Sequence, residues 1–384
     1  MPGVLIIGGG IAGTAAAMAL DKAGIDPTVY EAHPLTSQDG GAFLTLASNG
    51  MRALRQVDAD TAVSAVSAPL RTMRVCNGEG QQIATVALGD IDDPATGYRY
   101  LTRAQLCSAL HREAQGRGIR IERGKRLTQI TRHRAGVTAV FSDGSRACGD
   151  ALIGADGLNS AVRAIIDPTA TAPRYAGQRI FYGYSTGTGV YSPPDHFQVI
   201  RGPVAFGYIV TARNDTWWFC RVNDTELSRD EIRSGTTPRW KAALITRLRD
   251  DQTLAAGIVR AAHQVLVTNA YDLPDVRSWH RDHMLIIGDA AHAASPATGQ
   301  GASMALEDAV ILAKSLRDAP APADAFVIYE RLRRDRVQAN ITASARMSAA
   351  GHPGDRYQPV PASQRVTHVD EAIKTLLDWR TPLV

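Results

Sequence analysis

The sequence predicts an α/β fold in which a sheet-rich segment is inserted into a parallel-sheet domain. Two short apolar runs, Val4–Ile7 and 284–287, have the composition of strands that are buried on both faces of a parallel sheet. Each run is followed by a glycine-containing loop and a helical pattern, at 11–23 and at 302–317. Between them, aromatic residues concentrate at 175–219, which indicates a separate sheet.

Bulk composition limits the class of protein. The 384 residues are 45% hydrophobic and 21% charged, which is ordinary globular usage and excludes disorder, collagen-like and coiled-coil architectures. The formal net charge is +4, and the densest basic run, 331–336, contains Asp335 within a helical pattern. We therefore expect a solvated helix face and no nucleic-acid partner.

Cysteine usage and hydropathy favour a cytoplasmic protein. The 4 cysteines form no CxxC pair, so we expect reduced thiols, no disulfide framework and no metal site. The apolar start, 4–20, lacks a basic flank and is broken by glycines, unlike a secretory signal. No run reaches about 18 apolar residues, so no membrane span is expected.

The first motif is a GxGxxG sequence between a strand and a helix. Gly8 permits a tight turn, Gly10 lets the backbone approach a pyrophosphate, and Gly13 allows the helix to pack closely on the strand. A phosphate would lie at the helix N-terminus, beside Ile11 and Ala12. A strand at 27–30 completes a βαβ unit of about 30 residues, and Glu31 then follows as an acceptor for ribose hydroxyls.

The following elements are expected from periodicity and turn residues. Helices are predicted at 103–115, 239–249, 325–348 and 369–379; strands at 119–122, 126–132, 137–141 and 265–270; a hairpin at 71–86; and a Gly/Pro-rich loop at 351–361.

A second cluster follows the second apolar run. Asp289 would accept hydrogen bonds from hydroxyl groups of a cofactor, and the later glycines would bring bare backbone against a flat ring. The helix that starts near Gly301 would stabilise negative charge on that ring. A third motif, Asp156-Gly157, leads into a helix; it is equally compatible with a cofactor contact and with a turn that caps the helix.

In this order, the three motifs resemble those of the class A (single-component) FAD-dependent aromatic hydroxylases, a para-hydroxybenzoate hydroxylase-like family. The resemblance covers 1–345 and implies an α/β fold with a Rossmann-like, glutathione-reductase-type FAD-binding domain, an inserted sheet-rich substrate domain and C-terminal helices. The expected division is 1–70, 101–168 and 281–345 for FAD, 71–100 and 169–280 for substrate, and 346–384 as a C-terminal loop and helix.

The resemblance also assigns cofactor contacts. The ADP half of FAD would contact the first motif and Glu31, and Asp289 would bind the ribityl-phosphate region. Gly41 would lie along the flavin, and Arg103 near its phosphates. Asp156, together with Arg163, is associated with FAD and NAD(P)H binding. The ring contacts implied are Pro296, Gly299, Gln300 and Gly301. Ser303 stands where many relatives have asparagine.

The implied activity is monooxygenation. FAD, reduced by NAD(P)H, would react with O2 to give a C4a-hydroperoxide that hydroxylates an aromatic or polycyclic small molecule. The alternatives are a flavin-dependent dehydrogenase or reductase, a halogenase-like enzyme, or a non-catalytic flavin-binding protein. A monomer or homodimer is expected.

The aromatic segment is the candidate for the apolar substrate pocket that this chemistry needs. The candidate substrate residues are Tyr184, Phe197, Phe206, Tyr208 and Trp218, although about half of the side chains of an alternating strand face away from any one pocket. No catalytic base is identified, and His292 is interpreted as a packing and hydrogen-bonding residue.

Overall fold

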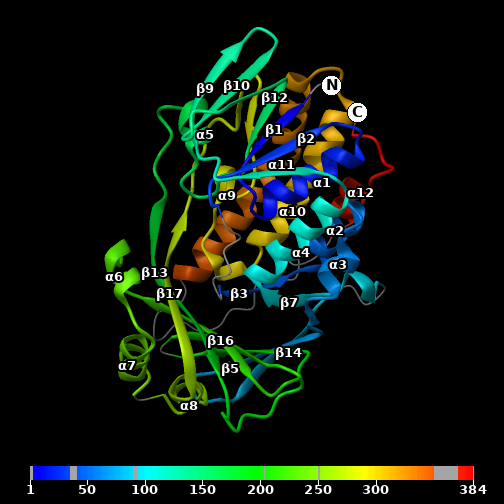
Figure 1. The fold of residues 1–384 in the computed structure, drawn as a ribbon. Helices are drawn as coiled ribbons and strands as arrows, with labels where there is room; N and C mark the ends of the chain where they lie inside the picture. Colours follow the sequence, from blue (N-terminus) through cyan, green and yellow to red (C-terminus); the bar gives the residue numbers. More distant parts are fainter. Residues whose placement is uncertain are drawn as a thin grey trace.

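The computed structural model describes residues 3–34, 41–89, 93–202, 204–249, 251–349 and 371–383. The predicted βαβ unit lies in a six-stranded sheet of order β18-β19-β12-β1-β2-β8 (Figure 1). β1 pairs in parallel with β12 and β2, as its wholly apolar sequence predicts. The strands are β1 (Val4–Ile7), β2 (Pro27–Glu31), β8 (Arg120–Arg123), β12 (Ala151–Gly154), β18 (His280–Arg281) and β19 (Met284–Ile286).

Helices from both ends of the chain pack together on this domain. α1 lies against α10, and α10 also contacts α2 and α11, so the segments that follow the two apolar runs are neighbours (Figure 1). The helices are α1 (Ile11–Lys22), α2 (Ser48–Gln56), α3 (Asp60–Ser64), α4 (Arg103–Gly116), α5 (Ala161–Ile166), α9 (Asp289–His292), α10 (Gly301–Asp318), α11 (Pro322–Ala349) and α12 (Glu371–Leu377), with 3₁₀ turns η1 (Pro94–Thr96) and η2 (Pro296–Thr298).

The aromatic segment forms a seven-stranded sheet of order β17-β13-β16-β15-β14-β5-β6. The hairpin expected at 71–86 forms β5 and β6 at its edge. The strands are β5 (Thr72–Asn77), β6 (Gln82–Ala87), β13 (Arg174–Ser185), β14 (His196–Arg201), β15 (Ala205–Val210), β16 (Thr216–Asn223) and β17 (Ala262–Asp272), and the accompanying helices are α6 (Arg229–Ser234), α7 (Thr237–Arg247) and α8 (Ala255–Arg260).

Two smaller sheets complete the described part of the fold. One has the order β11-β10-β9, and the other, β3-β7-β4, lies between the two large sheets. Their strands are β3 (Phe43–Leu46), β4 (Ala68–Pro69), β7 (Arg99–Thr102), β9 (Leu127–His133), β10 (Gly136–Phe141) and β11 (Arg146–Gly149).

The two faces of the seven-stranded sheet have different partners. One face packs against α7 and α8 in a core that includes Phe206, Trp218 and Trp240. The other face packs against β3 and β7, through Phe43 and Tyr100. The second face therefore looks toward the domain that carries the glycine motifs (Figure 1).

The α/β fold class is confirmed. The division into FAD and substrate segments remains a proposal, which the separate sheets support. The loop expected at 351–361 lies outside the described residues, whereas the terminal helix expected at 369–379 is observed as α12. No described helix is both long enough and apolar enough to span a membrane.

Candidate FAD and substrate site

Gly8 joins the first motif to the third. Its backbone has φ 107°, a conformation that favours glycine. A Cβ atom at this position would lie 2.3 Å from the backbone oxygen of Ala155. The loop after β1 and the loop after β12 are therefore in direct contact, which places Asp156 beside the glycine turn.

The N-terminus of α1 is open toward a ligand. Gly10 is its N-cap and supplies no side-chain cap, and the first turn carries no acidic residue. A Cβ atom at Gly10 would meet nothing within 4 Å, whereas one at Gly13 would lie 1.9 Å from the oxygen of Gly8. The free N–H groups of this turn and the helix dipole suit a phosphate.

Glu31 lies at the edge of the same turn. Its Oε2 accepts a hydrogen bond from the Gly9 N–H at 2.7 Å, and its Oε1 accepts one from the His33 N–H at 2.8 Å. Its side chain stays partly exposed, so it has room for ribose hydroxyls. On the opposite side of the turn, the buried His111 contacts the Gly9 oxygen through Nε2 at 2.6 Å. Burial lowers the pKa of His111, and sequence reasoning missed this residue because a single helical histidine has no distinguishing pattern.

The second cluster meets the first motif at the start of α1. A Cβ atom at Gly288 would lie 2.8 Å from the Cβ of Ala12, so the two sequence-distant glycine loops converge. Asp289, the next residue, is exposed. Asp289 and the similarly exposed side chain of Arg103 make no hydrogen bond within the described residues, so both charges are available to a ligand.

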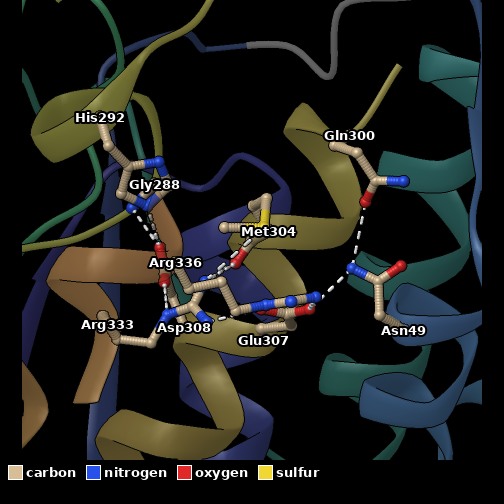
Figure 2. A network of polar contacts seen from close by, with 9 residues as sticks. All are labelled: Asn49, Gly288, His292, Gln300, Met304, Glu307, Asp308, Arg333 and Arg336. Atoms are coloured by element: carbon tan, nitrogen blue, oxygen red, sulfur yellow. Dashed lines mark hydrogen bonds and ion pairs between the residues drawn. The ribbon is translucent and has the colours of Figure 1, made fainter. Parts of the chain in front are cut away.

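A network of buried charged side chains holds the second cluster in position (Figure 2). Asp308 accepts a hydrogen bond from the Gly288 N–H at 2.8 Å through Oδ2, which also contacts His292 at 2.5 Å. Its Oδ1 accepts a hydrogen bond from Arg333 at 2.7 Å. Burial alone would raise the pKa of Asp308, but the charges of His292 and Arg333 outweigh burial and hold the pKa at about 2. The predicted packing and hydrogen-bonding role of His292 agrees with this arrangement.

The same network continues to the loop at 296–301. Arg333 and Arg336 donate to Glu307 at 2.5 and 2.8 Å. Asn49 of α2 then donates to Glu307 at 2.7 Å and to Oε1 of Gln300 at 3.1 Å, as Figure 2 shows. One set of buried side chains therefore positions both Gly288 and Gln300. Sequence reasoning missed Asn49. The solvated helix face expected at 331–336 is wrong at Arg333, which is fully buried.

The loop that contains Pro296, Gly299, Gln300 and Gly301 lies against β3. A Cβ atom at Gly299 would lie 3.2 Å from Oγ1 of Thr45. Gly301 begins α10, and its position is exposed. This loop therefore packs on β3, the strand that follows Gly41 and Ala42. The ring contacts predicted for the loop and for Gly41 remain proposals.

Asp156 caps a helix in this structure. Its carboxylate accepts hydrogen bonds from Oγ of Ser160 at 2.5 Å and from the Ala161 N–H at 2.8 Å. Arg163 then donates to the Ala290 oxygen at 2.9 Å. These contacts favour the capping alternative for Asp156, and they tie the third motif to the second.

The structure divides the substrate candidates between the two faces of the inserted sheet. Tyr184 and Phe197 are on the face that looks toward the glycine motifs, and the Tyr184 hydroxyl donates to the Gly41 oxygen at 2.8 Å. Phe206, Tyr208 and Trp218 are on the opposite face, within the core under α7 and α8. Strand alternation separates the two sets, so the latter three are not part of the substrate site proposed below.

A cavity of about 410 Å³ lies on the inward face of the sheet. Gly41 and Ala42, immediately before β3, form one side of it. The other side comes from β13 and β17, and the lining residues from these strands are Tyr182, Gln264, Leu266, Val267 and Thr268. Strand pairing brings these positions together, so no local motif in the sequence marks β17 as part of the site.

Comparison with known proteins identifies the family. The sequence profile of the FAD binding domain family matches residues 2–344. The chain belongs to this family. The aurachin C monooxygenase/isomerase of Stigmatella aurantiaca is 30% identical, over 91% of this chain and 89% of that protein. The FAD-dependent urate hydroxylase of Klebsiella pneumoniae is 29% identical, over 87% of this chain and 86% of the hydroxylase.

Solved structures of FAD-containing proteins have the same fold. Klebsiella pneumoniae HpxO, crystallised with FAD and uric acid, matches this chain with a TM-score of 0.82 and 26% identity, over 92% of this chain and 89% of HpxO. The predicted resemblance is thereby confirmed. The chain is an FAD-dependent monooxygenase that uses NAD(P)H.

The residues present fit FAD. The open helix start at Gly10 suits the pyrophosphate, and the free carboxylate of Asp289 and the free guanidinium of Arg103 remain for polar groups of the cofactor. No cluster of metal-ligating side chains occurs in the part of the chain that the structure describes. The individual contacts to FAD remain proposals.

Replacement of Asp289 by alanine tests one of these contacts. We expect the variant to fold normally, because the carboxylate is exposed and has no partner among the described residues. It should bind FAD about tenfold more weakly, the usual effect of losing one hydrogen bond to a charged group. Equilibrium dialysis with FAD measures the change, and unchanged affinity would contradict the proposed ribityl contact.

Proposed function

We propose that this monooxygenase hydroxylates an aromatic or polycyclic small molecule, with O2 as the oxygen donor, in the cavity between Gly41 and β17. The observation that carries the proposal is the position of this cavity. It borders Gly41 and Ala42, and the strand that follows them lies against the loop at Gly299. A substrate in the cavity would therefore be next to the reactive ring of the flavin.

The cofactor, when bound, accepts hydride from NAD(P)H and activates O2. The chain positions the substrate and excludes water. Leu266, Val267 and Phe43 give the cavity and its surroundings apolar surface, which slows the entry of water. The relatives that are named urate hydroxylase and 3-amino-4-hydroxybenzoate 2-monooxygenase support an aromatic substrate.

Tyr182 supplies a hydrogen-bond donor in this cavity. Burial raises the pKa of Tyr182 to about 12, so its hydroxyl keeps the proton at neutral pH. The hydroxyl has no hydrogen-bond partner among the described residues. We propose that it donates to the substrate, whereas the Tyr184 hydroxyl is occupied by the Gly41 oxygen.

We also propose a cytoplasmic protein that is monomeric or homodimeric. The free cysteines Cys76, Cys107, Cys148 and Cys220 support a reducing compartment. Sedimentation analysis of the holoenzyme would determine its oligomeric state.

Oxygen labelling tests the function. Phenolic and polycyclic compounds are screened with the holoenzyme for accelerated NAD(P)H oxidation under ¹⁸O2. We expect at least one compound to accelerate oxidation and to gain one ¹⁸O atom, as detected by mass spectrometry. Accelerated oxidation without labelled product would indicate a dehydrogenase or reductase, and flavin that NAD(P)H never reduces would indicate a non-catalytic flavin protein.

A further inference from the structure

Side chains from distant segments hold the backbone of Gly9 on both sides. Its N–H donates to Oε2 of Glu31 on β2 at 2.7 Å. Its carbonyl oxygen faces α4, where Nε2 of the buried His111 lies 2.6 Å away, and Oγ1 of Thr14 donates to the same oxygen at 3.2 Å. Because glycine itself allows many backbone conformations, the orientation of Gly9 depends on these contacts, of which the one with His111 is the shortest.

Arg123 of β8 decides which ring nitrogen of His111 carries the proton. Its Nη2 lies 3.1 Å from Nδ1 of His111. A guanidinium group can only donate, so Nδ1 accepts and carries no proton. A carbonyl oxygen can only accept, so Nε2 carries the proton and donates it to the Gly9 oxygen. The two partners together therefore select the neutral Nε2–H tautomer of His111.

The surroundings also favour the neutral form of this histidine. Burial lowers the pKa of His111, and the charge of Arg123 lowers it further. Together they outweigh the hydrogen bond to Gly9 and the charge of Glu31, which raise the pKa. An added proton would bind at Nδ1 and would face the donors of Arg123. Protonation would therefore break the contact that orients the ring.

The Gly9 oxygen belongs to the peptide bond that joins Gly9 to Gly10. No described peptide bond is cis, and the C=O and N–H groups of a planar trans peptide point in opposite directions. With the oxygen directed at His111, the Gly10 N–H points away from α4. Gly10 is the N-cap of α1, where we place the pyrophosphate of FAD. A side chain that fixes the oxygen thus also fixes a donor at the cofactor site.

We propose that His111 is a positioning residue for the cofactor. Held by Arg123 as the Nε2–H tautomer, it fixes the Gly9 carbonyl group and so aims the Gly10 N–H at the pyrophosphate of FAD. His111 acts through the peptide bond and not on the phosphate itself. The inference concerns cofactor binding alone and is independent of the substrate proposed above.

Variants that keep either the volume or the donor of His111 test this role. Leucine fills the buried space without a donor, whereas the terminal amide of glutamine can replace the Nε2–H. FAD release from the diluted holoenzyme is followed by the rise in flavin fluorescence, and FAD affinity is measured by titration. We expect His111→Leu to bind FAD about tenfold more weakly, because the buried Gly9 oxygen loses its main donor. His111→Gln should recover most of the affinity.

The order of the two variants separates positioning from packing. A residue that only fills space is replaced better by leucine, whereas a positioning donor is replaced better by glutamine. Arg112→Met changes the next residue of α4, which is exposed, and should leave FAD affinity unchanged. Unchanged affinity in His111→Leu, equal weakening in both variants, or tighter binding in His111→Leu than in His111→Gln would overturn the proposal.

Nitrogen NMR of the holoenzyme with ¹⁵N-labelled histidine tests the tautomer. The His111 signals, assigned by their absence from His111→Gln, should be those of the neutral Nε2–H form at neutral pH. Arg123→Met removes a like charge, so the pKa of His111 should rise above its wild-type value. Arg120→Met, at an exposed position of the same strand, should leave the titration unchanged. An Nδ1–H tautomer in the wild type, or an unchanged titration in Arg123→Met, would contradict the proposal.

The outcome is distinguishable from that of the proposed function. FAD binding and the tautomer of His111 are measured without substrate or turnover. Failure of the oxygen-labelling experiment would therefore leave this inference standing, and failure of the His111 variants would leave the proposed hydroxylation standing.

Discussion

A Gly10→Ala variant should fold like the wild-type protein and bind FAD at least about tenfold more weakly. The position accepts a methyl group sterically, because a Cβ atom there meets nothing within 4 Å and φ is −76°. The open space lies at the start of α1, where we place the pyrophosphate of FAD. A methyl group would therefore occupy the volume through which the phosphate approaches the backbone.

Two further glycine variants provide the comparison. Gly116→Ala adds a methyl group at another open position, at the end of α4, and should leave both stability and FAD affinity unchanged. Gly13→Ala should fail to fold normally, because its Cβ would lie 1.9 Å from the Gly8 oxygen. Thermal unfolding and FAD titration are measured for each variant. Equal FAD affinity of Gly10→Ala and wild type would place the pyrophosphate elsewhere.

Replacement of Arg333 by methionine should destabilise the protein by about 3–5 kcal/mol, the usual cost of removing one partner from a buried ion pair. Arg333 is fully buried and is bonded to both Glu307 and Asp308 (Figure 2). Without Arg333, the buried negative charges of Glu307 and Asp308 would be only partly balanced by the remaining hydrogen-bond donors, and no water would replace the lost ones. Because Asp308 also binds the Gly288 N–H, FAD retention should decrease as well.

Urea denaturation of the holoenzyme measures this loss. The matched control is Arg331→Met in the same helix, an exposed position where we expect a change within about 0.5 kcal/mol. A similar free energy of unfolding for Arg333→Met and Arg331→Met would contradict the role of the network.

Acid should weaken the same network. Asp308 has a folded pKa of about 2, below its ordinary 3.8. The contribution of Asp308 to stability is therefore present above pH 3.8 and is lost as pH falls through about 2.

The parts of the fold that the sequence predicts are those with local signals. The first motif is recognisable because the strand, the glycines, the helix and Glu31 follow one another directly. The second is recognisable because Gly288 and Asp289 follow an apolar run. In both cases the chemistry depends on adjacent residues, so a single stretch of sequence is enough to indicate it.

The missed features depend on contacts between distant segments. Helix α2 was not predicted, because its Asn49-Gly50 pair is typical of a turn. In the structure, a Cβ atom at Gly50 would lie 2.7 Å from Oγ of Ser303, so the glycine permits α2 to pack on α10, and Asn49 enters the buried network. The face on which each aromatic residue lies is equally nonlocal, because it depends on strand register and on which helices cover the sheet.

The far end of α11 connects the two halves of the molecule. There, Oγ of Ser348 contacts Oγ of Ser295, just before the loop at 296–301, at 2.9 Å. The Ser348 backbone oxygen accepts a hydrogen bond from Gln178 of β13 at 3.0 Å. A protein shortened at 344, where the family match ends, would keep every residue assigned here to FAD or substrate. It would nevertheless lose these contacts between the loop at 296–301 and the inserted sheet, so intact binding residues would not guarantee coupled reduction and oxygen transfer.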